Sequence, residues 1–293
     1  MRSVDETLAT AFRETMLSAV SSRVPSETPV LLSGGVDSGT LLAASLALGR
    51  RPVCFTAHVE GLPSADLATA RSMTEEFGLE HVEVAIPSDE EGLRRDVEAV
   101  VALTGSSGKV IVQVGQVYLH LARAVSDAWY ETCAHGMTAD NLWGLGKELG
   151  IGRAKRGREW FDAERRRYQD GQQYSNRFMV RLFATFGVAL SDPYRHGLLE
   201  DLLLSLDLHD LNRPVEKGPA ITAFPEFWGR GPWRRREGPL QIVSGVREWH
   251  DTLLADPDFN PRGRKRVADL YRDVKERLDG TANRALPLAE VVS

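Results

Sequence analysis

The stretch Ser33–Ser38 reads SGGVDS and directly follows a short apolar run at Pro29–Leu32. A loop that binds phosphate needs backbone N–H groups turned toward anionic oxygens, and it needs no bulky side chains in the way. Gly34 and Gly35 meet both needs, and the serines at either end add hydroxyl donors. Each charge-assisted hydrogen bond contributes about 1.5–3 kcal/mol, so several of them would hold a pyrophosphate firmly. We therefore predict a pyrophosphate-binding loop here, leading into a helix whose N-terminal partial charge points to the same place.

Asp37 lies inside this loop, although a carboxylate by itself repels phosphate. A role that suits it is to hold Mg²⁺, which then bridges to the phosphate oxygens. The loop differs from the two commonest phosphate-binding motifs, because neither GxxxxGK[ST] nor GxGxxG occurs in the chain. The stretch Gly105–Lys109 (GSSGK) has the wrong spacing, and we do not expect it to contact phosphate.

Strand-like and helix-like segments alternate over the first 145 residues. Buried strands are predicted at 29–32, 53–57, 81–86 and 129–134, with helices between them. This order predicts an α/β fold with a doubly wound parallel sheet, covered by helices on both faces. Ligands of such sheets bind at the carboxyl ends of the strands, where the glycine loop and Gly136 lie. Residues 146–293 lose the strand pattern, so we expect a nucleotide-binding core at 1–145 and a mostly helical substrate or lid lobe at 146–293, integrated with it.

Composition narrows the class of protein. A hydrophobic fraction of 42% is enough to bury a full core, and the net charge of −5 argues against a nucleic-acid partner. No apolar run of about 18 residues is present, and Met1–Arg23 carries charges where a signal peptide needs an apolar stretch. Two cysteines, Cys54 and Cys133, fit no zinc-binding spacing. We expect two reduced thiols in a cytoplasmic protein.

The SGGVDS loop after a buried strand resembles the PP-loop of the N-type ATP pyrophosphatases. Their fold is the adenine nucleotide alpha hydrolase-like (HUP-type) doubly wound sheet. Further segments resemble, in the same order, the synthetase domain of asparagine synthetase and β-lactam synthetase. These segments are Gly136–Gly144 (GMTADNLWG), Asn176–Arg177 with Phe186–His196 (FGVALSDPYRH), and Trp233–Gly238 (WRRREG). The resemblance covers roughly residues 28–245.

This resemblance implies ATP and Mg²⁺ as ligands and assigns roles to individual residues. Asp37 and Asp140 would hold Mg²⁺ on the ATP phosphates. The residues expected to bind ATP are Leu32, Ser33, Gly34, Gly35, Asp37, Ser38, Ala57, His58, His135 and Gly136. Asp140, Lys217 and Arg236 would take part in catalysis, with Lys217 and the Arg234–Arg236 cluster facing pyrophosphate or the acyl-adenylate.

The chain departs from the family pattern at several positions. The family's glutaminase domain needs a cysteine directly after Met1, and here Arg2 follows, so we expect that domain to be missing. Met137 stands where asparagine synthetases carry a glutamate and β-lactam synthetase a tyrosine, and a thioether cannot accept a proton. Arg236 replaces a lysine; it keeps the charge but cannot shuttle protons. These differences argue against asparagine synthesis itself.

The function implied is an ATP-dependent ligase that forms an amide or C–N bond. It would adenylate a small-molecule substrate, release pyrophosphate, and let an amine or ammonia displace AMP. A separate glutaminase, or a carrier or partner protein, would supply what this chain lacks. Two alternatives stay open: a sulfur-inserting enzyme that uses Cys133, and an ATP-binding partner subunit impaired at Met137. The basic stretch Arg153–Arg167 is expected to be a solvated helical face, with binding of RNA or an acidic carrier as the alternative.

Overall fold

The computed structural model describes residues 4–145, 147–167, 174–230, 233, 240–252, 255–258, 260–263 and 266–282. Among these residues five parallel strands form a single sheet in the order β3-β2-β1-β4-β5. The chain begins at the centre of the sheet, moves to one edge, and then crosses over to the other side of β1. The order therefore reverses between β1 and β4, which is where a doubly wound sheet opens a crevice for ligands. The strands are β1 Val30–Leu31, β2 Cys54–Val59, β3 His81–Ile86, β4 Thr132–Ala134 and β5 Ala189–Ser191.

Alternate residues of the strands enter two different hydrophobic cores, because successive side chains of a strand point to opposite faces. On β2, Cys54 belongs to one core while Phe55, Ala57 and Val59 belong to the other. Both faces of the sheet are thus covered by helices, which confirms the doubly wound α/β fold predicted from the strand and helix order. The helices that come before β4 are α1 Val4–Arg23, α2 Val36–Ala47, α3 Ala65–Phe77, α4 Glu90–Thr104 and α5 Lys109–Asp127.

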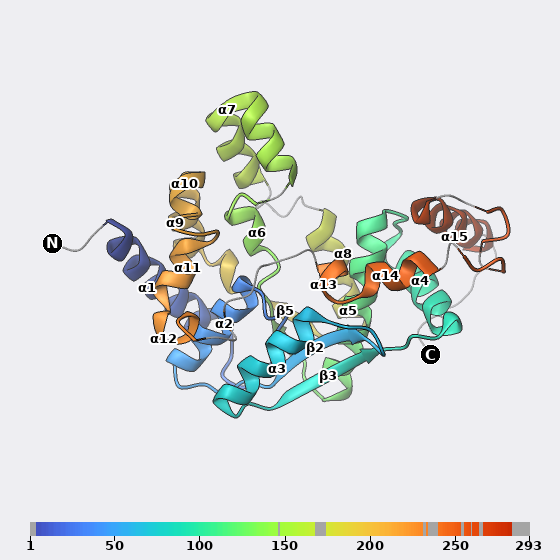
Figure 1. Ribbon diagram of the computed structural model, residues 1–293, viewed down its shortest axis with the longest axis horizontal. Coiled ribbons are helices and arrows are strands. Elements are labelled where there is room, and N and C mark those ends of the chain that lie inside the picture. The colour runs from blue at the N-terminus through green and yellow to red at the C-terminus, as the bar shows by residue number, and fades with distance from the viewer. Residues whose placement is uncertain are drawn as a thin grey trace.

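The part of the chain that follows β4 is mostly helical, as expected, and its longest helix, α7, is kinked at Gly157. Figure 1 shows α7 projecting at the top of the view and α15 at the far right, with the sheet low in the molecule. The helices of this part are α6 Ala139–Leu142, α7 Lys147–Arg167, α8 Tyr174–Thr185, the 3-10 turn η2 Pro193–Arg195, α9 Gly197–Ser205, α10 Leu208–Leu211, α11 Gly218–Ala223, α12 Pro225–Trp228, α13 Leu240–Val243, α14 Val246–Asp251 and α15 Val267–Ala282.

The strand β5 is one element that the sequence did not reveal. It has only three residues and carries no alternating run, yet it pairs in parallel register with β4 through Cys133 and Leu190. A short strand of this kind is defined by its neighbour rather than by its own pattern. It brings the segment that resembles the family motif at Phe186–His196 onto the same sheet as the glycine loop.

Several helices begin and end at capping residues that are typical of such positions. Ser64 caps α3 by accepting from the backbone N–H of Leu67 at 3.1 Å, and Gly78 ends that helix in the left-handed conformation. The N-cap of α4 is Asp89, whose carboxylate accepts from the backbone N–H of Gly92 at 2.6 Å. Among the described residues no single helix is long and apolar enough to cross a bilayer; α4 and α5 pass that test only jointly, as a pair bent by 106°.

Candidate nucleotide-binding site

The glycine loop lies at the carboxyl end of β1 and is closed by its own serines. Ser33 N donates to the Ser38 hydroxyl at 3.1 Å, and the two hydroxyl oxygens are 3.1 Å apart. Gly34 has φ +71°, and a Cβ there would lie 2.6 Å from Cβ of Thr69. Only glycine fits this position, because both its backbone conformation and the close approach of α3 exclude a side chain. The loop ends at Gly35, which is the N-cap residue of α2. No side chain forms a capping hydrogen bond at this end of the helix.

Asp37, Asp140 and Lys217 meet at the mouth of this loop. The ammonium of Lys217 donates to Asp37 Oδ2 at 2.6 Å and to Asp140 Oδ1 at 2.8 Å. The Lys217 side chain is 1% exposed and Asp37 16%, whereas Asp140 is 63% exposed. The residues lie at three distant places in the sequence: in the first turn of α2, in α6, and before α11. The fold therefore brings two carboxylates and one ammonium together at the switch point of the sheet.

Two other segments hold Asp37 and its surroundings in place. The indole N–H of Trp143 donates to Asp37 Oδ1 at 2.9 Å, and the Tyr194 hydroxyl donates to the Asp37 carbonyl at 3.0 Å. Asp192, which follows β5, accepts from the Thr138 hydroxyl at 2.6 Å in the loop between β4 and α6. The segments that resemble family motifs thus contact one another directly around the carboxylates.

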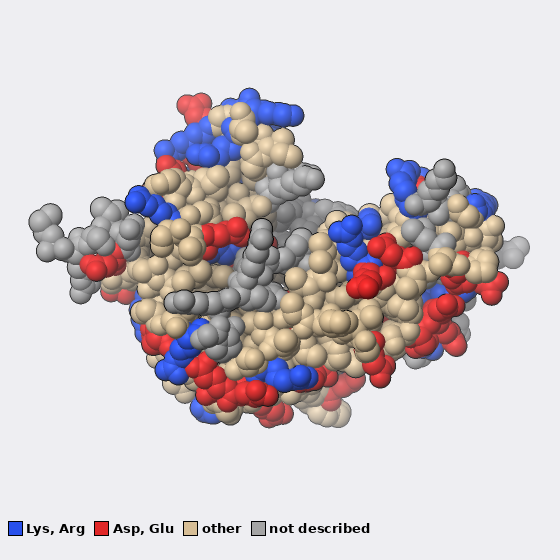
Figure 2. All heavy atoms as spheres, viewed as in Figure 1, with Lys and Arg blue, Asp and Glu red and all other residues tan. Residues whose placement is uncertain are grey.

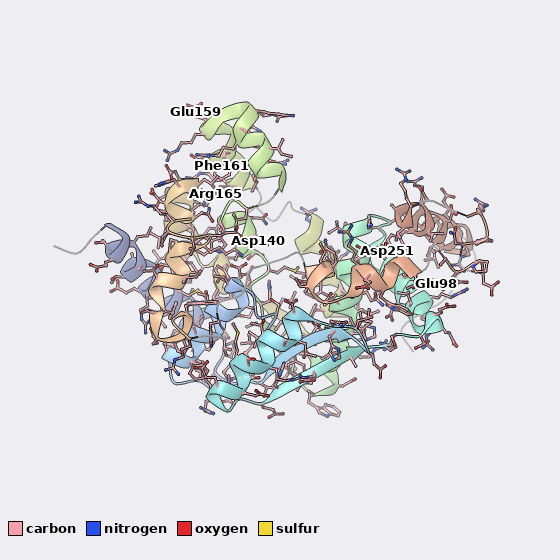
Figure 3. The ribbon with its side chains drawn as sticks, in the orientation of Figure 1. Glu98, Asp140, Glu159, Phe161, Arg165 and Asp251 are labelled. Carbon is pink, nitrogen blue, oxygen red and sulfur yellow. The ribbon has the colours of Figure 1, made fainter. Side chains whose placement is uncertain are left out.

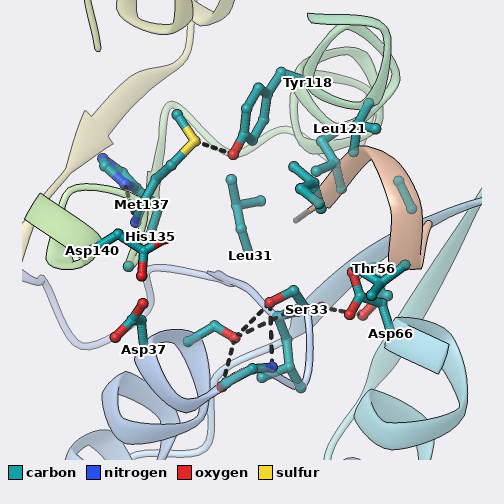
Figure 4. Close-up of a pocket in the computed structure, with 18 of the residues that line it drawn as sticks. Leu31, Ser33, Asp37, Thr56, Asp66, Tyr118, Leu121, His135, Met137 and Asp140 are labelled. Carbon is teal, nitrogen blue, oxygen red and sulfur yellow. Dashed lines mark hydrogen bonds between the residues drawn. The ribbon is translucent and has the colours of Figure 1, made fainter. Parts of the chain in front are cut away.

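A cavity of about 420 Å³ opens beside these groups. Figure 4 shows Asp37 and Asp140 pointing toward one another on one side of it, with Asp66 and Thr56 on the opposite side. Of the residues predicted to bind ATP or take part in catalysis, ten line the cavity: Leu32, Ser33, Gly35, Asp37, Ser38, Ala57, His135, Gly136, Asp140 and Lys217. The other lining residues are Leu31, Phe55, Thr56, Asp66, Val117, Tyr118, Leu121, Met137, Leu145, Glu216, Leu240 and Val243.

Three predicted residues are not among the lining residues. Gly34 faces Thr69 of α3 instead, and its part is to shape the loop. His58 lies on β2, with Nδ1 3.3 Å from the carbonyl oxygen of Val59. Arg236 and its neighbours Arg234 and Arg235 lie outside the described residues. Trp233, which begins that motif, is buried and donates its indole N–H to Glu76 at 3.0 Å.

His135 and Gly136 directly follow β4 and lie against the residues of the glycine loop and the start of α2. A Cβ on Gly136 would lie 2.9 Å from the carbonyl carbon of Asp37, so glycine lets the two loops touch. The His135 imidazole is buried, and desolvation lowers its pKa despite the nearby charge of Asp192. Its Nδ1 accepts from Met137 N at 3.2 Å, which assigns the proton of the neutral ring to Nε2. The His135 ring therefore lines the cavity as an uncharged group whose orientation is held by a hydrogen bond.

The sequence did not reveal the part of the cavity that α5 and α13 build. Val117, Tyr118 and Leu121 of α5 line the cavity together with Leu240 and Val243 of α13. The helical spacing of α5 indicates a buried face, but it does not distinguish residues that pack from residues that line a cavity. Only the tertiary structure brings α13 against this face.

The Tyr118 hydroxyl contacts the sulfur of Met137, as Figure 4 shows. Burial raises the pKa of Tyr118, and the charges of Asp140 and Asp66 raise it further. The phenol is therefore neutral near pH 7 and acts as a hydrogen-bond donor. Neither Met137 nor Tyr118 can take a proton here at neutral pH, so this side of the cavity offers no general base.

Cys133 lies in β4 with no exposure and is not among the residues that line the cavity. Burial raises the pKa of its thiol, and it raises that of Cys54 to about 12. A buried protonated thiol is a poor nucleophile, which argues against a sulfur-transfer role. We expect both thiols to resist a disulfide reagent at pH 8 in the native protein and to react only after unfolding. Cys133→Ser is expected to keep full turnover, and a loss of turnover with retained folding would restore the sulfur-transfer hypothesis.

The glycine loop lies at the switch point of a doubly wound α/β sheet, which is where ligands of such folds bind. The sequence model of the asparagine synthase family matches residues 11–200, which is more than half of the 293 residues. The chain therefore belongs to the asparagine synthase family, an ATP-using family of synthetases. The match includes the glycine loop, Asp140 and β5, whereas Lys217 lies beyond it. A search of curated proteins finds none that matches the chain.

Proposed function

We propose that this protein is an ATP-dependent ligase that adenylates a carboxylate substrate, releases pyrophosphate, and joins the acyl group to an amine or ammonia. The observation that supports it most is the Lys217 bridge between Asp37 and Asp140 beside the glycine loop. Backbone N–H groups and serine hydroxyls would hold the ATP phosphates. The carboxylate oxygen would attack the α-phosphorus, and the bond from that phosphorus to the bridging oxygen would break to free pyrophosphate.

The two carboxylates, which a single ammonium bridges, fit Mg²⁺, because hard oxygen ligands are what this ion prefers. A cation already lies between them in the form of the Lys217 ammonium, which shows that the position attracts positive charge. Bound Mg²⁺ would neutralise charge that develops on the phosphate oxygens. Lys217 would remain a buried cation next to the departing pyrophosphate, where a positive charge is most effective.

The second step, transfer of the acyl group, depends on the protonation state of the amine. The neutral amine nitrogen attacks the acyl carbon, AMP leaves with the bonding electron pair, and the proton that the nitrogen loses passes to the departing AMP phosphate or to water. Only an uncharged amine has the lone pair for this attack, and neither Met137 nor the neutral Tyr118 can take a proton from an ammonium, so the amine is expected to arrive uncharged. This requirement distinguishes the proposed reaction from one in which a residue at the position of Met137 acts as base.

Incubation with ATP, Mg²⁺, a panel of carboxylic acids and an amine tests the proposal. We expect AMP and pyrophosphate in equal amounts, and a carboxylate labelled with ¹⁸O should pass one labelled oxygen to AMP. Formation of ADP and phosphate would contradict adenylation. AMP without label would show that ATP is split by water rather than by the acid.

The contact between Tyr118 and Met137 also favours a second candidate, an ATP-binding partner subunit without turnover. The Met137 thioether and the Tyr118 hydroxyl occupy the position where a general base would act, and neither group can act as a base. Equilibrium binding of ATP with no AMP formed, over the whole acid panel and with candidate partner proteins added, would support this candidate.

A further inference from the structure

The helix α7 is strongly basic, and one of its arginines is buried whereas others are exposed to solvent. Eight lysines and arginines lie between residues 147 and 167, against four acidic residues. Figure 2 shows basic side chains gathered on this helix at the top of the molecule. Arg165 instead points into the protein, with 0% of its side chain exposed. Figure 3 shows it between Phe161 of α7 and the segment that carries Asp140.

The guanidinium of Arg165 donates to carbonyl oxygens at the ends of two other helices. Its Nη2 contacts the carbonyl of Leu142, the last residue of α6, and the carbonyl of Leu203 at 2.6 Å. Its Nη1 donates to the carbonyl of Leu206, which caps α9, at 3.0 Å. Carbonyls in the last turn of a helix have no partner within that helix, so a cation with several donors is well suited to them. Burial lowers the pKa of Arg165 to about 10, which leaves it charged at neutral pH.

The Leu142 carbonyl belongs to the short segment that carries both Asp140 and Trp143. Asp140 is two residues earlier in the same short helix, and Trp143 follows directly. The Trp143 indole is the group that donates to Asp37 Oδ1. Both carboxylates of the proposed Mg²⁺ site are therefore oriented by the one segment whose end Arg165 holds.

We propose that Arg165 is a positioning residue for cation binding: by holding the Leu142 carbonyl it sets Asp140 directly and Asp37 through Trp143. The inference rests on the proposed function, because it takes Asp37 and Asp140 to hold Mg²⁺ during nucleotide binding. Arg165 is not among the residues that line the cavity. Groups behind a metal ligand typically change metal affinity about 10- to 100-fold when they are removed.

Three variants test the role of Arg165: Arg165→Met, Arg165→Lys and, as a matched control, Arg166→Met on the exposed side of α7. ATP affinity is measured by calorimetry over a range of Mg²⁺ concentrations, at a temperature where circular dichroism shows each variant folded. We expect Arg165→Met to raise the Mg²⁺ concentration for half-maximal ATP affinity about tenfold. Arg165→Lys should recover part of this, since it keeps the charge but not the planar fork that serves three carbonyls. Arg166→Met should match the wild type.

The outcomes separate this inference from the proposed function. A folded Arg165→Met protein with the wild-type Mg²⁺ requirement, and only a lower melting temperature, would overturn the positioning role and leave the function standing. If Arg165→Met does not fold, the Arg165→Lys variant provides the test. An unchanged Mg²⁺ requirement for ATP binding by Arg165→Lys would then overturn the positioning role of Arg165. An ATP affinity of the wild-type protein that does not depend on the Mg²⁺ concentration would contradict both the proposed function and this inference.

Discussion

Asp37→Asn is expected to lower the rate of pyrophosphate release by about 10²- to 10³-fold, the usual cost of removing one group that stabilises charge in a transition state. The amide keeps the shape of the side chain and can still accept from the Trp143 indole, but it loses the negative charge that pairs with Lys217 and would hold Mg²⁺. Folding should survive, since Lys217 retains Asp140 as a partner. The measurement is pyrophosphate release at saturating ATP and Mg²⁺, with circular dichroism to verify the fold.

Asp201→Asn provides the matched control, because this carboxylate is exposed on α9 and is not among the residues that line the cavity. It should behave as the wild type in every assay. Retention of more than about a tenth of the wild-type rate by Asp37→Asn would contradict the role of Asp37 in the site.

Lys217→Met is expected to change metal binding and turnover in opposite directions. In the protein without nucleotide, Mg²⁺ should bind about tenfold more tightly, because an ammonium 2.6 and 2.8 Å from the two carboxylates no longer competes for them. Turnover should fall about 10²- to 10³-fold, because the buried cation beside the pyrophosphate is lost. Without Mg²⁺ the variant should lose up to about 3 kcal/mol of stability, since Asp37 is left without its buried partner.

Thermal melting with and without Mg²⁺ checks this prediction most directly. The ion should raise the melting temperature of Lys217→Met by more than it raises that of the wild type. Lys155→Met, which removes an exposed lysine from α7, is the control and should show the wild-type response. An equal response of Lys217→Met and wild type to Mg²⁺ would mean that the ion does not bind where the ammonium lies.

The site also has consequences for the order of events in the proposed reaction. Adenylation depends on groups that the structure brings together: the glycine loop, two carboxylates and Lys217. Transfer to an amine depends on an uncharged amine, and neither Met137 nor Tyr118 can take a proton from an ammonium. The rate of the second step should therefore rise with pH as more of the amine becomes neutral, up to the pKa of the amine itself.

Sequence alone determined the features that depend on short spacing. A glycine pair between serines after an apolar run specifies a phosphate loop, because the backbone conformation of Gly34 and the approach of α3 leave room for no side chain. Four of the five strands, the parallel sheet and the loop around Asp37 followed from the same local patterns, whereas the segment around Asp140 was assigned by its resemblance to a family motif. Ten residues expected to form the site do line one cavity.

Other features depend on which distant segments pack together, and only the tertiary structure decided them. The strand β5 exists because β4 offers it hydrogen-bond partners. The apolar wall of the cavity needs α13 to lie against α5. Lys217 was predicted from a resemblance, but its position between Asp37 and Asp140 is set by residues 180 and 77 positions apart in sequence. Arg165 looked like one more cation on a solvated helix, but its guanidinium points inward and donates to carbonyls at the ends of α6 and α9, which lie far from it in sequence.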